Sequence, residues 1–269
     1  MKMNKIIRII ILMIAISLMS FSGYRLYDIY SEYKKGNDLY NNIAEEFVNI
    51  SENTNTLDEK ESETKKSNSE IPSISNQDNE LEGGIDINVD FEALIESNED
   101  IIGWIYSPDT PINYPIVQSE DNNYYLRRML DGTYNTAGTI FMDYRNNKDL
   151  TDLNTIIYGH NIKNNSMFGT LDLYKEQEYY EKHPLVYLIS PHQTIEIELI
   201  AGLVVSERSE IYDIPNDQDS LNSLYKRILE KSTFKSNVLL EEGDRLVTLS
   251  TCSYENDSAR YVVVGKITS

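Results

Sequence analysis

Between residues 101 and 267 the chain carries eight short segments rich in β-branched and aromatic residues, and turn-forming residues separate them. Segments of this kind predict β-strands, and eight short strands with few helices between them predict a β-barrel or a β-sandwich. The expected strands are Ile101–Ser107, Ile112–Gln118, Thr139–Asp143, Asn154–Tyr158, Leu185–Ser190, Thr194–Val205, Arg245–Thr251 and Tyr261–Ile267. The sequence therefore predicts a mainly β domain.

Two helices accompany these strands. Asp90 to Ile95 predicts a short capped helix at the start of the domain. Ser220 to Lys231, between the sixth and seventh strands, places Leu221, Leu224 and Ile228 at helical spacing. Asp217 and Asp219 before it suit a helix N-terminus.

The N-terminus predicts a membrane anchor. Lys2, Lys5 and Arg8 precede a run without charges from Ile9 to Phe21. Counted from Ile6 to Tyr24, the mainly apolar stretch, residues 6–24, is close to the roughly 20 residues needed to cross a bilayer. No small-residue cleavage site follows it, so we favour an uncleaved signal anchor over a cleaved signal peptide. The basic residues before the span predict a cytoplasmic N-terminus, with the remainder of the chain outside the membrane.

The segment between the anchor and the β-rich domain has a different composition. Leu26 to Ile50 has apolar residues at helical spacing and predicts a helical stalk. Ser51 to Gly84 is polar and poor in apolar residues, which predicts a flexible acidic tether. We therefore expect three parts: an N-terminus with anchor at 1–25, a stalk and tether at 26–87, and a folded extracytoplasmic domain at 88–269.

Charge and cysteine content exclude several functions. The net charge of −20 disfavours nucleic acid as a partner, because an acidic chain repels a phosphate backbone. Cys252 is the single cysteine, so an internal disulfide, a zinc ribbon and an iron–sulfur site are excluded. We expect no metal and no cofactor.

Cys252 stands at the end of an expected strand, where a side chain can reach solvent. It is either a small buried hydrophobe or a nucleophile, and a nucleophilic thiol needs a nearby base or cation. His160 is the candidate base because it also ends an expected strand, whereas His183 and His192 lie in turns and are expected to be exposed. If the last two strands pair as a hairpin, Arg260 lies opposite Cys252.

Arg260 in that position could donate hydrogen bonds to an oxyanion. The alternative is a surface ion pair with Asp257 or Glu255. The residues alone leave both interpretations open.

Thr248 to Cys252 followed by Arg260, together with Tyr158 to Asn161 upstream, resembles the active-site signature of the sortases. Further segments resemble class B of that family in the same order, and the similarity covers nearly all of 88–269. These segments are Asp90-Phe91, Ile102 to Ile105, Asn113 to Gln118, Asn123 to Leu126, Gly138 to Asn146 and Asn165 to Gly169. The helix between strands six and seven also resembles the class B insertion.

The resemblance implies an eight-stranded sortase-type β-barrel with peripheral helices. It also implies a transpeptidase fixed to the outer face of a Gram-positive-type membrane through residues 6–24. Such enzymes cut a C-terminal sorting signal, similar to Asn-Pro-Gln-Thr-Asn, after its threonine, and pass the acyl group to a peptidoglycan amine.

By the same resemblance, Cys252 is the nucleophile that forms a thioester, His160 moves the proton, and Arg260 holds the oxyanion or the substrate backbone. Contacts to the sorting peptide are implied for Leu126, Ser250, Ile211 and Tyr212.

Two other functions fit the residues. One is a membrane-anchored binding module or adhesin with an inert Cys252. The other is a thiol hydrolase, in which water rather than an amine takes the acyl group.

Overall fold

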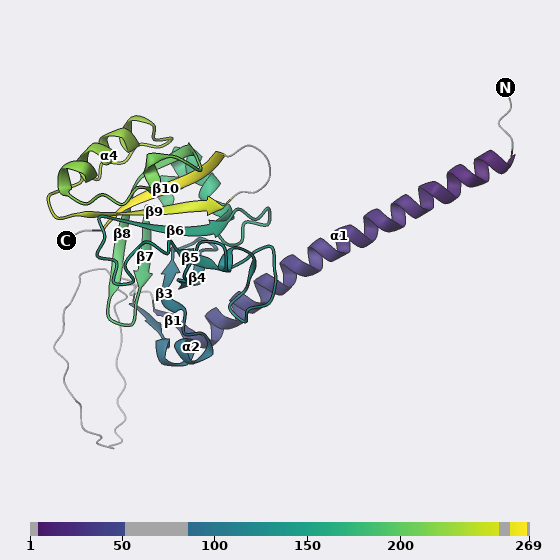
Figure 1. The fold of residues 1–269 in the computed structure, drawn as a ribbon, viewed down its shortest axis with the longest axis horizontal. Helices are drawn as coiled ribbons and strands as arrows, with labels where there is room; N and C mark the ends of the chain where they lie inside the picture. Colours follow the sequence, from purple (N-terminus) through teal and green to yellow (C-terminus); the bar gives the residue numbers. More distant parts are fainter. Residues whose placement is uncertain (1–4, 52–85, 253–258, 268–269) are drawn as a thin grey trace, which may run out of the picture.

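The structure is a computed structural model that describes residues 5–51, 86–252 and 259–267. Eight strands form a closed barrel in the order β10-β8-β7-β3-β4-β5-β6-β9 (Figure 1). The strands are β3 (Ile101–Tyr106), β4 (Asn113–Val117), β5 (Ile140–Met142), β6 (Asn154–His160), β7 (Leu185–Ile189), β8 (Thr194–Ser206), β9 (Arg245–Cys252) and β10 (Ala259–Ile267). The barrel confirms the predicted fold, and all eight strands lie where the sequence predicted them.

Two neighbouring strand pairs in the barrel are parallel, namely β4 with β5 and β6 with β9, and the other neighbours are antiparallel. Every residue of β6 is buried, because it runs between β5 and β9 and is covered on both faces. In β8, by contrast, Ile195 and Ile197 are buried while Glu196 is exposed, as expected of a strand with one solvent face. β6 is therefore enclosed along its whole length.

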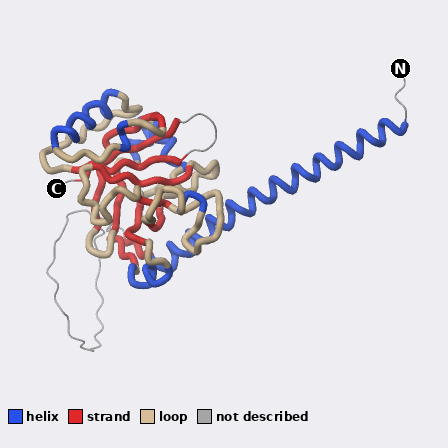
Figure 2. The backbone as a smooth tube through the Cα atoms, viewed as in Figure 1, coloured by secondary structure: helices blue, strands red, loops and turns tan. Residues whose placement is uncertain are grey.

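The helices lie around the barrel (Figure 2). They are α1 (Lys5–Phe47), α2 (Phe91–Ser97), α3 (Gln177–Lys182) and α4 (Gln218–Glu230), with 3₁₀ turns η1 (Tyr125–Arg127), η2 (Gly169–Lys175) and η3 (Glu210–Tyr212). Asp90 caps α2 by accepting the N–H of Ala93 at 3.1 Å, and Asp217 caps α4 by accepting the N–H of Ser220 at 2.7 Å. Both predicted helices are thus present, with carboxylates at their starts.

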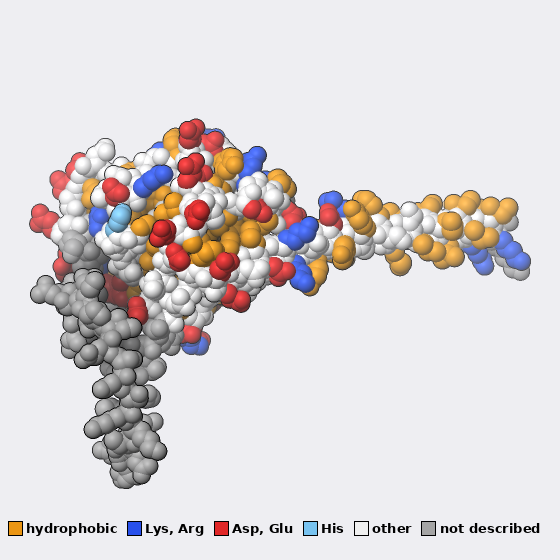
Figure 3. All heavy atoms as spheres, turned by 90° about the horizontal axis from the view of Figure 1, so that it is seen from below, with side chains coloured by type: hydrophobic (Ala, Val, Ile, Leu, Met, Phe, Trp, Pro, Cys, Tyr) orange, Lys and Arg blue, Asp and Glu red, His pale blue; other side chains and the backbone are white. Residues whose placement is uncertain are grey.

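Helix α1 has 43 residues, about 65 Å at 1.5 Å per residue, and its outer part projects away from the domain (Figures 1 and 3). The apolar side chains of this part, from Ile6 to Phe21, are exposed, and the helix is long and apolar enough to cross a membrane. The N-terminal helix is therefore compatible with a membrane anchor.

The inner part of α1 differs from the expected stalk. Tyr40 is 2% exposed, and Tyr33, Ile43 and Phe47 pack against the barrel core. The apolar spacing that predicted a stalk is the face of α1 that covers the domain.

The predicted stalk helix also ends earlier than expected. Residues Val48–Ser51 form strand β1, which pairs antiparallel with β2 (Asp86–Val89) from Val48↔Val89 to Ser51↔Asp86. Most of the segment expected to be a tether, residues 52–85, lies outside the described residues, and this pairing brings the two chain ends that flank it together.

Candidate active site

The floor of the candidate site is the parallel pair of β6 and β9. Their register runs from Asn154↔Leu246 to His160↔Cys252, so the histidine and the cysteine are neighbours across the last position of the pair. The prediction that both residues end strands is therefore confirmed, although they are far apart in the sequence.

The imidazole of His160 is 8% exposed, and its Nε2 lies 2.5 Å from the carbonyl oxygen of Leu126. A carbonyl oxygen only accepts hydrogen bonds, so Nε2 carries the hydrogen and donates it. In the neutral imidazole Nδ1 is then the nitrogen that carries the lone pair, able to exchange a proton with a thiol or an amine.

Gly159 makes room for the packing around this histidine. A Cβ at this position would overlap the side chains of Ile140 and Phe168. The backbone N–H of Phe168 donates to the carbonyl oxygen of His160 at 3.0 Å. His160 is thus fixed both at its ring and at its backbone.

Arg260 reaches the same end of the sheet from β10. The last two strands, β9 and β10, pair antiparallel from Val262↔Ser250 to Ile267↔Arg245, so the predicted pairing of these strands is confirmed. Arg260 lies two residues before this register begins, and its position opposite Cys252 stays a prediction. An ion pair of Arg260 with Asp257 or Glu255 falls outside the described residues.

A groove of about 470 Å³ lies beside this strand end, and Leu126, Tyr212 and Arg260 are among the residues that line it. Its wall includes a row of three aromatic rings, in which Tyr158 lies between Phe141 at 5.2 Å and Tyr212 at 6.1 Å between ring centroids. The groove is lined mainly by polar residues, and it presents aromatic rings and a guanidinium near the ends of β6 and β9.

A buried carboxylate organises one side of the groove. Asp143 accepts hydrogen bonds from Nε and Nη2 of Arg145, both at 2.8 Å, and from the hydroxyl of Tyr158 at 2.9 Å. Burial acts to raise the pKa of this carboxyl, but the bonds and charge of Arg145 outweigh it and hold the pKa below its usual value. Arg145 also donates to the carbonyl oxygen of Tyr212 at 3.0 Å, which ties η3 to this network.

The four residues expected to contact a peptide fall into two groups. Leu126 and Tyr212 line the groove, whereas Ser250 is 0% exposed and Ile211 is 2% exposed. The hydroxyl of Ser250 lies 2.9 Å from that of Tyr212. Ser250 and Ile211 are thus more deeply buried than Leu126 and Tyr212, and contact of all four residues with a peptide stays a prediction.

The other two histidines lie elsewhere. His192 is exposed in the turn between β7 and β8, as expected. His183 is only half-buried rather than exposed, because its ring packs on Tyr179 at 4.5 Å and its Nδ1 lies 3.2 Å from the carbonyl oxygen of Pro108.

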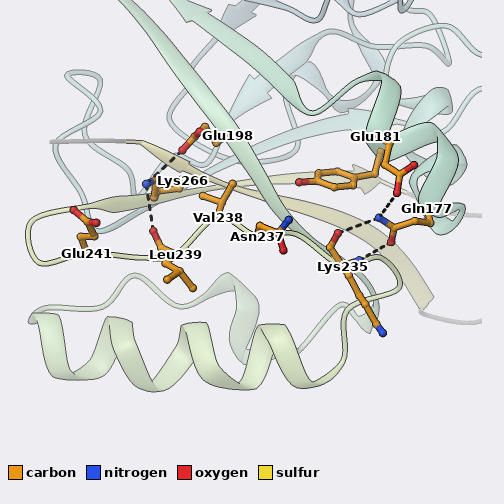
Figure 4. A pocket seen from close by; sticks show the side chains of 10 residues that line it. Gln177, Glu181, Glu198, Lys235, Asn237, Val238, Leu239, Glu241 and Lys266 are labelled. Atoms are coloured by element: carbon orange, nitrogen blue, oxygen red, sulfur yellow. Dashed lines mark hydrogen bonds and ion pairs between the residues drawn. The ribbon is translucent and has the colours of Figure 1, made fainter.

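A second hollow, of about 510 Å³, lies at the opposite end of β10 (Figure 4). Lys266 donates to the carbonyl oxygen of Leu239 at 3.2 Å and lies 3.4 Å from Glu198 and 3.6 Å from Asp244. Figure 4 shows its side chain directed at Glu198 and Leu239. Among the described residues no group of three or more His, Cys, Asp or Glu could hold a metal ion.

Two sets of residues at the site were not predicted. Asp143 and Arg145 could have been noticed as an acid and a base directly after a short apolar strand. Tyr40 could have been noticed only from the four-residue spacing of Glu32, Gly36 and Tyr40, which marks one face of a helix.

Comparison with known proteins agrees with this geometry. The family profile described as "Sortase domain" matches residues 105–268. The sortase B of Listeria monocytogenes serovar 1/2a is 39% identical over 180 residues, which are 65% of this chain and 72% of that protein.

Two solved structures are also similar. A Staphylococcus aureus sortase B–substrate complex has a TM-score of 0.64 and 32% identity, covering 66% of this chain and 84% of the other. A sortase B complexed with triglycine has a TM-score of 0.64 and 32% identity, covering 66% and 85%.

Proposed function

This chain belongs to the sortase family, as a class B cysteine transpeptidase, and we propose that it joins secreted proteins carrying a C-terminal sorting signal to a peptidoglycan amine. The observation that carries the proposal is the register that makes His160 and Cys252 neighbours at the end of β6 and β9. A nucleophile beside a base at a groove is the arrangement that acyl transfer requires.

In the proposed mechanism Nδ1 of His160 takes the thiol proton of Cys252, and the resulting thiolate attacks the carbonyl carbon of the signal's threonine. The carbonyl electrons move to its oxygen, and the Arg260 guanidinium stabilises this oxyanion by donating hydrogen bonds. When the tetrahedral intermediate collapses, the peptide C–N bond breaks and His160 gives its proton to the departing amine. The acyl group remains on Cys252 as a thioester.

The second half of the reaction reverses these roles. An incoming amine attacks the thioester carbonyl, His160 takes a proton from the amine nitrogen, and the C–S bond breaks to give an amide and the free thiolate. Because Nε2 of His160 donates to Leu126, we assign these proton transfers to Nδ1.

The proposed substrate is an extended peptide similar to Asn-Pro-Gln-Thr-Asn, lying in the groove lined by Leu126 and Tyr212. Ser250 and Ile211 would act from beneath, because the Ser250 hydroxyl holds Tyr212. The similar sortase B structures, one in a substrate complex and one complexed with triglycine, support a peptide donor and an amine acceptor.

We further propose that residues 6–24 of α1 cross the cell membrane once, with 1–25 as cytoplasmic N-terminus and anchor and 88–269 as the extracytoplasmic catalytic domain. The exposed apolar surface of α1 and its basic start support this orientation in a Gram-positive-type envelope. The substrate would then meet the enzyme at the outer face of the cell membrane.

The test is a ligation assay with the full chain in detergent micelles. A panel of sorting-signal peptides is supplied with and without triglycine, and products are separated by chromatography. We expect a triglycine-linked product that is lost in Cys252→Ala. Cleavage at the same rate with and without amine would instead indicate the hydrolase, and no turnover of any peptide would count against the proposed reaction.

A further inference from the structure

The inner half of α1 contacts the loop between η1 and β5 through a stripe of residues on one face of the helix, namely Glu32, Gly36 and Tyr40. Glu32, Gly36 and Tyr40 are spaced by four residues and face the same side. The Glu32 side-chain carboxylate accepts a hydrogen bond from the backbone N–H of Thr136 at 2.8 Å. The backbone carbonyl oxygen of Glu32 accepts one from the side-chain amide of Asn135 at 3.0 Å. The helix that carries the apolar anchor is thus fastened to this loop by hydrogen bonds as well as by packing.

Tyr40 is the most deeply placed member of the stripe. Its hydroxyl donates to the carbonyl oxygen of Gly138 at 2.7 Å and lies 2.8 Å from Oγ1 of Thr139, which in turn donates to Arg128 at 2.8 Å. Burial raises the pKa of the Tyr40 hydroxyl above its ordinary value, so it remains a donor.

One path leads from this contact to the imidazole of His160. The N–H of Thr139 donates to the carbonyl oxygen of Tyr125 at 3.0 Å. Gly138 adopts φ +60° and lies so close to the carbonyls of Tyr125 and Leu126 that a Cβ would overlap both. The Leu126 carbonyl is the acceptor for Nε2 of His160. The backbone of Gly138, to which Tyr40 is hydrogen-bonded, therefore packs directly against the Leu126 carbonyl that orients the His160 imidazole.

A second path leads to the backbone of the same histidine. The ring of Tyr40 packs edge to face on Tyr114, with 5.7 Å between centroids. The Tyr114 hydroxyl accepts the N–H of Met167 at 3.0 Å, and the next residue, Phe168, donates its N–H to the carbonyl oxygen of His160. Tyr40 is thus connected to both sides of His160 through short chains of contacts.

We propose that Tyr40, on the membrane-anchoring helix, is a positioning residue that holds the His160 imidazole through the Leu126 carbonyl. The inference rests on the proposed function, because it requires His160 to be the proton carrier. In consequence α1 serves two purposes, since the same helix anchors the chain and sets the geometry of the proposed proton carrier.

The test compares Tyr40→Phe with Tyr30→Phe in the full chain in detergent micelles. Tyr40→Phe keeps the ring and its packing on Tyr114 but removes the donor. Tyr30 is 65% exposed on the same helix and is the matched control. The measurements are kcat and KM for a sorting peptide with triglycine, the pH profile of kcat/KM, and the thermal unfolding midpoint.

For Tyr40→Phe we expect kcat to fall about fivefold, the size of one hydrogen bond's contribution, with KM within about twofold of wild type. The hydrogen bond to the Leu126 carbonyl stabilises the protonated form of His160. Weakening this bond lowers the pKa of the imidazolium, so the basic limb of the pH profile of kcat/KM moves to lower pH. Tyr30→Phe should match wild type in all measurements. A lower unfolding midpoint alone would not move the pH profile.

The inference is overturned if Tyr40→Phe has the kcat and pH profile of Tyr30→Phe while His160→Gln is inactive, a result that leaves the proposed function intact. If His160→Gln retains wild-type turnover, the proposed function fails and the inference fails with it. If Tyr40→Phe loses kcat only in proportion to the unfolded fraction, with an unchanged pH profile, Tyr40 is merely structural and the inference is wrong.

Discussion

Strand β10 carries one basic side chain near each end, and the two have different surroundings. Lys266 has 11% of its side chain exposed and lies within 3.6 Å of a carbonyl and two carboxylates. Arg260 has 18% exposed, lines the groove beside Cys252, and forms a longer ion pair of 4.0 Å with Glu207.

Under the proposed mechanism the two ends of β10 have different tasks: Lys266 stabilises the fold, and Arg260 takes part in the reaction. A buried cation must be compensated, and at Lys266 the protein supplies the compensation. At Arg260 the guanidinium lines the groove, and the proposed mechanism gives it the oxyanion to stabilise. Substitutions at the groove end should therefore change turnover, and those at the Lys266 end should change stability.

The largest expected effect is at the groove end. His160→Gln should lower kcat by about a thousandfold, because a positioned acid–base group contributes roughly 10² to 10⁴. The matched control is His192→Gln, in an exposed turn. Peptide–triglycine ligation rates check both variants. Equal rates would remove His160 from the mechanism.

Arg260→Lys should lower kcat/KM by about a hundredfold, because an ammonium cannot reproduce the planar fork of a guanidinium. Arg208→Lys, at an exposed residue of the same groove, is the control for charge and size. Steady-state kinetics with a sorting peptide decide the matter. A comparable loss in both variants would mean that the groove depends on guanidinium groups in general and not on the one at Arg260, and an unchanged kcat/KM in Arg260→Lys would mean that positive charge alone is sufficient there.

Sequence reasoning predicted the barrel well because turn residues and β-branched runs mark each strand locally. It did not predict β1, because Val48–Ser51 continues the apolar spacing of the helix and its partner β2 follows a long polar segment. A local sequence pattern does not identify the distant segment that pairs with a given strand, here β2 with β1.

The same limit applies to the site. Cys252, His160 and Arg260 were selected as candidates because each ends or opens an expected strand, and the register of β6 and β9 makes His160 and Cys252 neighbours. The burial of Ser250 and its contact with Tyr212 of η3 could not be predicted, because they depend on a tertiary contact that the sequence does not encode locally.

At the opposite end of β10, Lys266→Met should lower the free energy of unfolding by about 2 kcal/mol, since Asp244 and Glu198 lose their cation. Turnover should remain that of wild type. The control is Lys235→Met, at an exposed lysine of the same hollow. Urea unfolding measures the change in the free energy of unfolding. Reduced turnover of the folded Lys266→Met variant would contradict the claim that this end of β10 affects stability alone.

The smallest effect concerns the groove wall and depends on pH. The pKa of the Asp143 carboxyl is lowered in the folded state, so its contribution is full above the unfolded value of about 3.9 and is lost as the pH falls through the lower folded value. Wild type should exceed Asp143→Asn by about 1 kcal/mol in unfolding free energy at neutral pH, with the gap closing in acid. Asp149→Asn, at an exposed carboxylate, is the control, and a gap between wild type and Asp143→Asn that stays constant with pH would contradict the prediction.

The central claim is that Cys252 forms a thioester with the sorting signal. The direct measurement is intact-protein mass spectrometry of the full chain after mixing with an Asn-Pro-Gln-Thr-Asn peptide. We predict one adduct with the mass of the acyl fragment ending at threonine, mapped to Cys252, absent in Cys252→Ala and discharged by triglycine to a ligated peptide. Peptide cleavage without any adduct, or an adduct that persists in Cys252→Ala, would contradict the account.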